Sequence, residues 1–264
     1  MQKLKRLYTL VALFSNFLAV IQAHYVGTNL QYFRLWGGAV FKVVNTNNNL
    51  GTIIEVFYLK EYRDLEDLKY VVRPVVIDIG ANIGTFTVWA LRTLPDARVI
   101  AYEPESTNFR LLTENICLNN ISSQTTAFKR AVGGELGERS LAIAGESSGK
   151  NSLSFEIGDG THEIVMCTTL DMIFADNAIT HCHCLKVDCE GAEYELLYGA
   201  SAETLAKIDM IILEYHRVAG ESTDKLQEFL RQHGFVIEIS KLFSGMLTAR
   251  RTTLTMPRAA SISE

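Results

Sequence analysis

The sequence predicts an α/β fold with a mostly parallel seven-stranded sheet, helices on both faces and a C-terminal antiparallel hairpin. Two observations predict it. From Pro74 onward, short β-branched runs alternate with longer segments of helical periodicity, which is typical of βαβ units. The first of these runs also leads through a glycine-containing turn into an amphipathic helix. A chain of 264 residues, 48% of them apolar, can bury one such core with an elaboration.

The predicted elements follow one another in regular order after Pro74. The first six strands are expected at 75–79, 98–103, 125–132, 184–188, 208–214 and 235–239. Helical periodicity lies between them at 85–93, 107–118, 192–198 and 223–233. A seventh strand at 241–250 follows with no helix before it, so it should pair with 235–239 as a hairpin. Strand-like pieces at 139–144, 152–155 and 163–168 predict a small β insertion near 138–168.

The chain ends lie outside this alternating region. We interpret residues 1–73 as an N-terminal helical cap, 74–251 as the main domain and 252–264 as a tail. Within the cap, apolar residues recur at helical spacing over 7–23, behind a short basic segment. This run fits a helix that packs on the protein, a cleaved signal or a membrane contact. Because polar residues interrupt it and it is shorter than the roughly 20 residues of a membrane span, we favour packing and do not expect membrane contact.

The composition of the chain limits the kinds of partner that we expect it to bind. The net charge is −5 and the basic residues are scattered, so we do not expect nucleic acid to bind. A small-molecule or glycan substrate fits better. The 5 cysteines are an odd number without the spacing of a disulfide framework, which favours a reducing compartment, and we expect a cytoplasmic protein. The oligomeric state is not predicted.

The strongest chemical signal is the turn after the first strand. Asp78, Gly80, Asn82 and Gly84 lie where the strand 75–79 passes into the next helix, which predicts a backbone cradle at the carboxyl end of the sheet. The glycines allow a ligand to approach the main chain. The spacing is Gly-x-x-x-Gly and lacks the Gly-x-Gly-x-x-Gly of dinucleotide sites, so a cofactor without pyrophosphate is favoured.

A second acidic residue completes the predicted cofactor site. Glu103 ends the second strand, 25 residues after Asp78, where an acid accepts hydrogen bonds from ribose hydroxyls. Asp78 is placed to hold the ammonium of a methionine moiety, directly or through water. Together they favour S-adenosylmethionine as the cofactor.

Titratable residues gather at the ends of two later strands. Asp188 and Glu190 follow the strand 184–188, and alternation should send both side chains toward the same crevice. The strand 208–214 ends in Glu214, with His216 close behind it. The sequence therefore predicts a site rich in ionisable groups.

These residues resemble a known family. The segments 78–85, 102–104, 168–171, 186–193 and 214–216 are similar in order and spacing to FkbM-type methyltransferases, over roughly residues 50–240. The resemblance implies a Rossmann-like class I methyltransferase fold and S-adenosylmethionine-dependent O-methylation of a hydroxyl on a sugar or polyketide-like metabolite.

The resemblance also assigns residues. It places Asp78, Gly80, Asn82 and Gly84 in the cofactor loop and makes Glu103 the ribose-binding acid. It matches Lys186, Asp188, Glu190, Gly191 and Glu193 to the family's Lys-x-Asp-x-Glu-Gly-x-Glu block, in which Cys189 replaces a usual aliphatic residue.

Methyl transfer to an alcohol requires removal of a proton with a pKa of about 16. His216 is the candidate base, with Asp188 and Glu190 as alternatives. The carboxylates of Asp188, Glu190 and Glu214 could instead hold a magnesium-like divalent ion, which we do not favour, and no residue is assigned as a metal ligand. Lys186 is expected to pair with a carboxylate.

Other interpretations stay open. An NAD(P)-dependent oxidoreductase or epimerase shares the predicted fold but would require the missing glycine pattern. The non-enzymatic alternative is a module that binds the cofactor but has no catalytic activity. Glu193, near a helix start, is expected to satisfy only the helix dipole. The segment 181–184, His-Cys-His-Cys, enters a strand and alternates faces, so we expect a surface loop and no zinc site.

Overall fold

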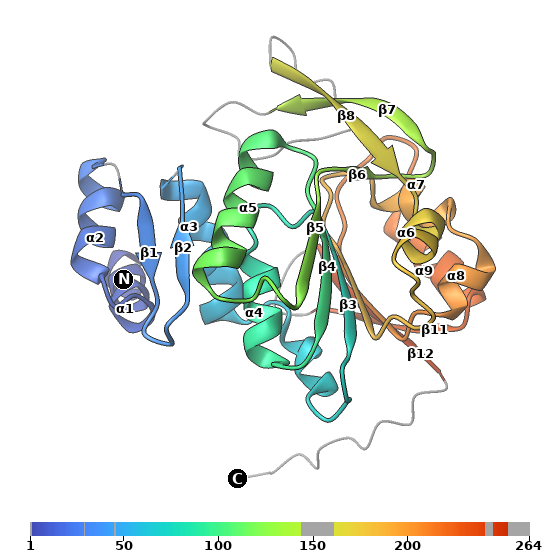
Figure 1. The fold of residues 1–264 in the computed structure, drawn as a ribbon, viewed down its shortest axis with the longest axis horizontal. Coiled ribbons are helices and arrows are strands. Elements are labelled where there is room, and N and C mark those ends of the chain that lie inside the picture. The colour runs from blue at the N-terminus through green and yellow to red at the C-terminus, as the bar shows by residue number, and fades with distance from the viewer. Residues whose placement is uncertain (1, 29, 45, 144–160, 241–244, 253–264) are drawn as a thin grey trace.

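A seven-stranded sheet forms the centre of the molecule in the computed structural model, which describes residues 2–28, 30–44, 46–143, 161–240 and 245–252 (Figure 1). The strand order is β11-β12-β10-β9-β3-β4-β5, and only β12 runs antiparallel to its neighbours. The predicted sheet and C-terminal hairpin are confirmed. The strands are β3 (Val75–Ile79), β4 (Arg98–Tyr102), β5 (Thr125–Phe128), β9 (Cys184–Val187), β10 (Met210–Glu214), β11 (Phe235–Ile239) and β12 (Met246–Arg251).

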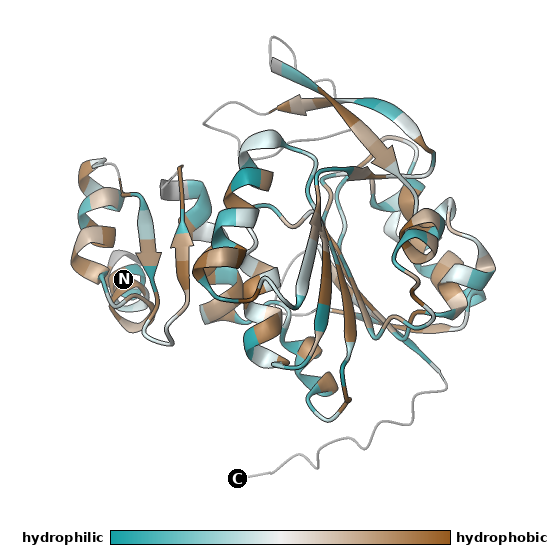
Figure 2. Cartoon of the chain, viewed as in Figure 1, coloured by the Kyte–Doolittle hydropathy of each residue, from teal (hydrophilic) through white to brown (hydrophobic). Residues whose placement is uncertain are grey.

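Helices cover both faces of this sheet (Figure 1). On one face lie α4 (Thr85–Thr93) and α5 (Ser106–Leu118); on the other lie α6 (Leu170–Asp176), α7 (Glu193–Tyr198), α8 (Ala202–Ala206) and α9 (Thr223–Gln232). Successive strand residues face opposite sides, so Val76 joins the core of the first face and Ile77 that of the second. Figure 2 shows the hydrophobic residues concentrated on the central strands.

The N-terminal cap differs from the prediction because it contains strands as well as helices. Its elements are α1 (Gln2–Leu13), α2 (Phe17–Val26), β1 (Tyr32–Arg34), β2 (Val40–Lys42), α3 (Thr46–Ile54), the π-helical turn η1 (Glu55–Leu59) and the 3-10 turn η2 (Arg63–Leu68). The helix expected over 7–23 is two helices. It breaks at Asn16, whose side chain amide donates to the carbonyl of Tyr32 at 2.9 Å and accepts the N–H of Arg34 at 3.0 Å. That pairing to β1 replaces the helical continuation.

Two asparagine side chains of α5 attach the cap to the main domain. Asn119 accepts the N–H of Val40 at 3.0 Å and donates to its carbonyl at 2.7 Å. Asn115 does the same for Lys42, at 2.6 and 3.2 Å. Each amide thus pairs with β2 as a neighbouring strand would. The cap also shares one hydrophobic core with α4 and α5.

A second, three-stranded sheet with the order β6-β8-β7 lies above the carboxyl end of the main sheet (Figure 1). Its strands are β6 (Ala131–Val132), β7 (Gly137–Ile143) and β8 (Thr161–Thr168). The single strand expected over 125–132 is therefore wrong, since β5 and β6 belong to different sheets. The pieces expected at 152–155 and at the start of 241–250, and most of the tail, lie outside the described residues.

Over the ranges that the structure describes, no helix combines the length and the apolar character that crossing a membrane requires.

Candidate active site

The turn between β3 and α4 lies against Asp188, directly after β9, and against Leu112 of α5. Gly80 makes the first approach possible and Gly84 the second. Gly80 and Gly84 have φ of 73° and 87°, a region that side chains disfavour. A Cβ on Gly80 would lie 1.7 Å from the carbonyl oxygen of Asp188. Asn82, between the glycines, has φ 51°. The predicted backbone cradle is present in the structure.

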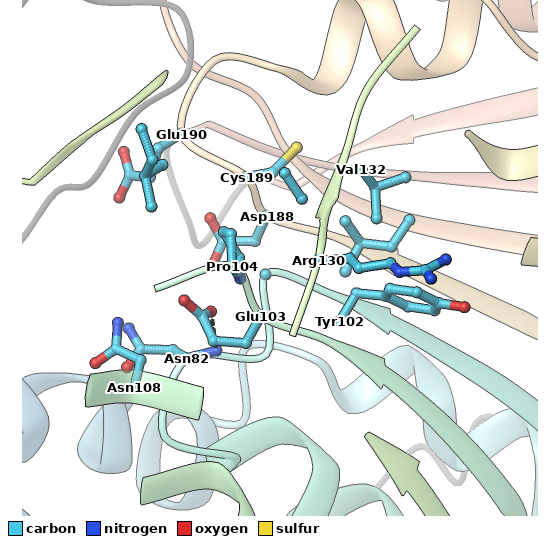
Figure 3. A pocket seen from close by; sticks show the side chains of 14 residues that line it. Asn82, Tyr102, Glu103, Pro104, Asn108, Arg130, Val132, Asp188, Cys189 and Glu190 are labelled. Carbon is cyan, nitrogen blue, oxygen red and sulfur yellow. Dashed lines mark hydrogen bonds between the residues drawn. The ribbon is translucent and has the colours of Figure 1, made fainter. Parts of the chain in front are cut away.

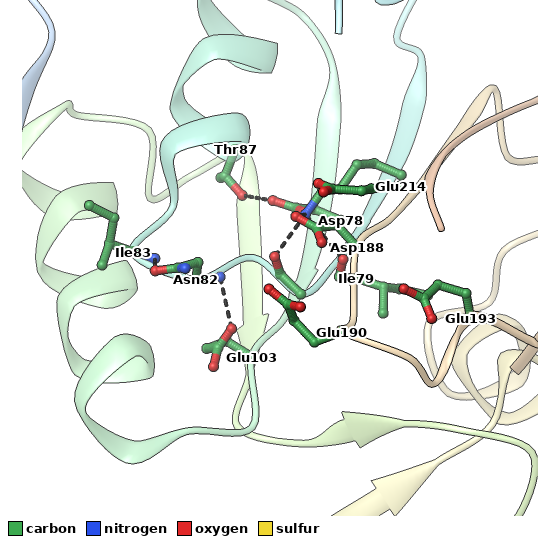
Figure 4. A network of polar contacts seen from close by, with 12 residues as sticks. Asp78, Ile79, Asn82, Ile83, Thr87, Glu103, Asp188, Glu190, Glu193 and Glu214 are labelled. Atoms are coloured by element: carbon green, nitrogen blue, oxygen red, sulfur yellow. Dashed lines mark hydrogen bonds and ion pairs between the residues drawn. The ribbon is translucent and has the colours of Figure 1, made fainter. Parts of the chain in front are cut away.

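Glu103 stands at the end of β4 and faces this turn (Figure 4). Its carboxylate accepts the N–H of Asn82 at 2.8 Å and the N–H of Glu105 at 3.0 Å. Only 5% of the residue is exposed, and burial raises the pKa of this carboxyl to about 7 although the two N–H groups lower it. Each oxygen retains a lone pair for a further donor.

A pocket opens between the turn, β4, β6 and β9 (Figure 3). Gly80, Asn82 and Glu103 line it as the sequence predicts. Tyr102 and Cys189, which lie in the segments that resemble the family, line it as well. Sequence reasoning missed Asn108, Arg130 and Leu141 among the lining residues. Only the three-dimensional arrangement brings α5, β6 and β7 to this place, and no local sequence signal marks it.

Asp78 is not among the residues that line the pocket, and its expected hold on a ligand ammonium, directly or through water, stays a prediction. The residue is fully buried, and its carboxylate accepts the hydroxyl of Thr87 at 2.6 Å. The ammonium beside it belongs to Lys186, 3.2 Å away. Lys186 in turn donates to the carbonyl of Gly80 at 2.7 Å. Asp78 and Lys186 thus hold the cofactor turn from below.

The charges around Lys186 keep it protonated. Burial lowers the pKa of this ammonium, but the negative charges of Asp78 and Asp188 outweigh burial and raise it above the usual value. Asp188 lies 3.8 Å from the ammonium. Asp188 and Glu190 both line the pocket, as their alternation predicted (Figure 3).

His216 lies beside Glu190, held by three carboxylates. Its Nδ1–H donates to Glu193, while its Nε2 lies 3.1 Å from Glu190 and 3.6 Å from Glu214. Glu193 is fully buried at the start of α7. The proposed restriction of Glu193 to the helix dipole is therefore wrong: its carboxylate orients the imidazole. Figure 4 shows Glu190, Glu193 and Glu214 around this part of the site.

The carboxylates determine the protonation of His216. Burial disfavours the imidazolium, but the hydrogen bond to Glu193 and the charges of Glu193, Glu190 and Asp188 raise the pKa of His216 to about 9. Burial and the charge of Asp188 raise the pKa of Glu214 to about 7. At neutral pH the ligand-free site therefore contains a cationic His216.

The cap adds two acids to this region that sequence reasoning missed. Burial, followed by the charges of Glu214, Glu55 and Asp188, raises the pKa of Glu61 to about 8. Burial and Asp188 likewise raise the pKa of Glu55. Both residues lie in or directly after η1. The sequence shows a charged segment here, but the packing of the cap decides which side it faces.

Among the described residues, two groups have metal-ligand character. Asp188, Glu190 and His216 place ligand atoms within 4.8 Å of one another. To ligate an ion here, His216 would have to release its proton, so any metal binding by this group should weaken as the pH falls. His181, His183 and Asp209 form the other group, with the imidazole of His181 2.6 Å from Asp209.

The second group does not form the tetrad that segment 181–184 suggests. Cys182 and Cys184 are buried in the core, on the opposite side of the alternation from the histidines. The Nδ1 of His183 accepts the N–H of Val75 at 3.0 Å, which leaves the proton of a neutral ring on Nε2. His183 is therefore a poor metal ligand.

Comparison with known proteins gives a family match. The methyltransferase FkbM domain matches residues 78–237, which is more than half of the chain. The chain is 26% identical over 264 residues to the 31-O-demethyl-FK506 methyltransferase FkbM of Streptomyces tacrolimicus, covering 84% of this chain and 98% of that protein. It is also 26% identical over 213 residues to the methyltransferase sdnD of Sordaria araneosa, covering 67% and 82%.

Two further similarities are more limited. The chain is 29% identical over 203 residues to the AMB antimetabolite synthetase AmbE of Pseudomonas aeruginosa, a match that spans 62% of this chain but only 10% of that protein. Among solved structures, the METTL16 MTase domain superposes with a TM-score of 0.50 at 14% identity, covering 88% of this chain and 89% of that one. This second likeness concerns the fold, which is that of a class I methyltransferase.

Proposed function

We propose a reaction for this chain, which belongs to the FkbM methyltransferase family: transfer of a methyl group from S-adenosylmethionine to a hydroxyl oxygen of a small metabolite or glycan. The methyltransferase activity follows from the family. The cofactor, the oxygen acceptor and the acceptor class are our proposal. The observation that carries it is the imidazole of His216, oriented by the buried Glu193 beside the pocket.

The pocket residues suit an adenosine-containing cofactor without phosphate. Gly80 lines the pocket with main chain alone, and Glu103 offers a buried carboxylate for two ribose hydroxyls. When bound, S-adenosylmethionine supplies a methyl group on a sulfonium. The acids Asp188 and Glu190 at the same rim suit this positive charge.

His216 is the group best placed to take the acceptor proton. Its Nδ1 is committed to Glu193, so the other nitrogen, Nε2, faces Glu190 and Glu214. The neutral imidazole of His216 is a stronger base than that of an ordinary histidine, because its conjugate acid has a pKa of about 9. This lessens the difference in pKa between the base and an alcohol. The base must first lose its own proton. Asp188 and Glu190 are the alternative bases and, with Glu214, can orient acceptor hydroxyls by accepting their hydrogen bonds.

The oxygen acceptor has independent support from a relative. The name of the Streptomyces protein specifies an O-demethyl compound as what it methylates. We extend this to a hydroxyl on a sugar or polyketide-like metabolite for the present chain.

The proposal is tested with isotopically labelled S-adenosylmethionine and a panel of hydroxyl, amine and carboxylate acceptors. We expect a methyl ether, recognised by a methoxy signal in NMR and by stability to alkali. His216→Asn should reduce turnover about 10²–10⁴-fold with cofactor binding preserved. The matched control is His233→Asn, because His233 lies at the end of α9. This change should leave turnover unchanged. An N-methyl or alkali-labile ester product would contradict the oxygen acceptor, and normal turnover of His216→Asn would contradict the base.

A further inference from the structure

The outward face of α1 is apolar although it meets solvent. One side of the helix buries Leu10 and Phe14 completely in the core shared with the main domain. On the other side, Leu4, Tyr8 and Val11 are 74%, 68% and 40% exposed. These three positions recur at helical spacing and share one face. A helix on a protein surface ordinarily presents polar residues there, so the apolar outward face needs a partner.

Trp36 extends this face. Its side chain is 61% exposed, and its indole N–H donates to the carbonyl of Val11 at 2.9 Å, which fixes the ring beside α1. We call Leu4, Tyr8, Val11 and Trp36 the α1 patch. Tyrosine and tryptophan suit a boundary between an apolar medium and water because each has an apolar ring and a polar tip. The patch lies at the end of the molecule opposite α8 (Figures 1 and 2).

The net charge of residues 1–54 is positive, opposite in sign to that of the complete chain. Residues 1–54 contain no Asp and no Glu, whereas the complete chain has a net charge of −5. Lys5 and Arg34 are exposed near the patch, on α1 itself and on the strand that pairs with the α1–α2 junction. An apolar, aromatic surface is thus combined with cationic side chains, in a segment of the sequence that has no acidic residue.

This combination identifies the partner. We propose that the α1 patch docks peripherally on an anionic lipid surface, with its apolar side chains at the level of the headgroups and Lys5 beside them against the lipid charges. A symmetric second copy on this face would bring two cationic segments together. A helix of 12 residues is too short to span the roughly 30 Å hydrocarbon core, so the contact is interfacial.

The inference revises the expectation from sequence. The apolar run was expected to pack on the protein, and one side of α1 does so. On the other side, Leu4, Tyr8 and Val11 of the patch are exposed. Packing and lipid contact therefore belong to different faces of the same helix.

The test is sedimentation of the full chain with vesicles of phosphatidylcholine alone or with phosphatidylglycerol added, at low and high salt. We expect binding to the anionic vesicles only, weakened by salt. Leu4→Gln combined with Val11→Gln should reduce the bound fraction at least tenfold. Lys5→Gln should weaken binding about fivefold.

Ile164→Gln combined with Val236→Gln is the matched control. These residues are 65% and 51% exposed outside the patch, and their replacement should leave vesicle binding unchanged. Circular dichroism and methyl transfer, measured on each variant, separate loss of docking from loss of the fold. The proposal is overturned if wild type does not sediment with anionic vesicles or if both double variants bind equally. It is also overturned if ultracentrifugation shows a dimer that Leu4→Gln with Val11→Gln dissociates, because a second copy would then cover the patch.

Discussion

His216 shows how neighbouring charges adapt one residue to a reaction. Because its pKa is about 9, the imidazole is mostly protonated at pH 7 and can accept no proton until it loses its own. As long as the pH is below the pKa, the neutral fraction of His216 grows about tenfold for each unit by which the pH rises. We therefore expect kcat/KM to rise from pH 7 to about 9 and then to level off. A profile that is flat over this range would show that another group removes the acceptor proton.

Glu193 is the positioning residue behind this behaviour. Glu193→Gln keeps a hydrogen-bond acceptor for Nδ1 but removes the charge that raises the pKa of His216. The rising limb of the pH profile should move to lower pH. Titration of the His216 ring by NMR provides an independent readout, and an unchanged midpoint would mean that Glu193 has only a structural role.

Gly80 is the residue on which the cofactor cradle depends. Gly80→Ala would place a Cβ 1.7 Å from the carbonyl of Asp188 and also strain a φ of 73°. We expect loss of cofactor binding and a clearly lowered Tm. Gly51→Ala is the control: it lies within α3 with no atom within 4 Å of the new Cβ and should stabilise by about 0.5–1 kcal/mol. Equal effects of the two changes on calorimetric Tm would contradict the clash argument.

At the level of elements, strands and turns of the core were predictable, and their partners were not. β3 and β4 are β-branched runs bounded by Gly or Pro, so their positions follow from local sequence. Whether 125–132 is one strand or two depends on β8, which pairs with β6 from far along the chain. The same limit applies to Asp78. Its position at the end of β3 was correct, but only the register of β9 reveals Lys186 beside it.

The buried pair Asp78–Lys186 joins β3 to β9 beneath the site. Lys186→Met would leave the fully buried Asp78 without its cation and should cost about 3–5 kcal/mol of unfolding free energy. Lys207→Met removes the surface partner of Glu203 and should cost about 0–1 kcal/mol. Denaturant unfolding of both variants measures the two losses of unfolding free energy, and equal losses would contradict the role of the buried pair. Asp78→Asn combined with Lys186→Met should recover part of the loss, since no uncompensated charge stays buried.

At the scale of the whole molecule, the cap and the main domain share one core and the amide contacts of α5. Sequence reasoning found the cap but not its attachment, because Asn115 and Asn119 read as ordinary polar helix residues. Likewise, the acids Glu55 and Glu61 reach the site only through this docking.

This attachment predicts a local effect. Asn115→Ala combined with Asn119→Ala removes the partners of the Val40 and Lys42 N–H groups. Hydrogen exchange at these two amides should accelerate, while amides of β9 keep their protection. Asn177→Ala, whose side chain contacts Tyr102 on β4, is the control. Unchanged exchange at β2 would show that the apolar core alone holds the cap.

The central claim is that the pocket binds S-adenosylmethionine through Glu103. Isothermal titration calorimetry of wild type and Glu103→Ala with S-adenosylmethionine, S-adenosylhomocysteine, NAD and NADPH tests it most directly. We expect both sulfur compounds to bind wild type at one site, and Glu103→Ala to weaken them about 10–100-fold, as befits loss of hydrogen bonds to a charged group. Binding of only the nicotinamide nucleotides, or sulfur-cofactor binding that is indifferent to Glu103→Ala, would contradict the account.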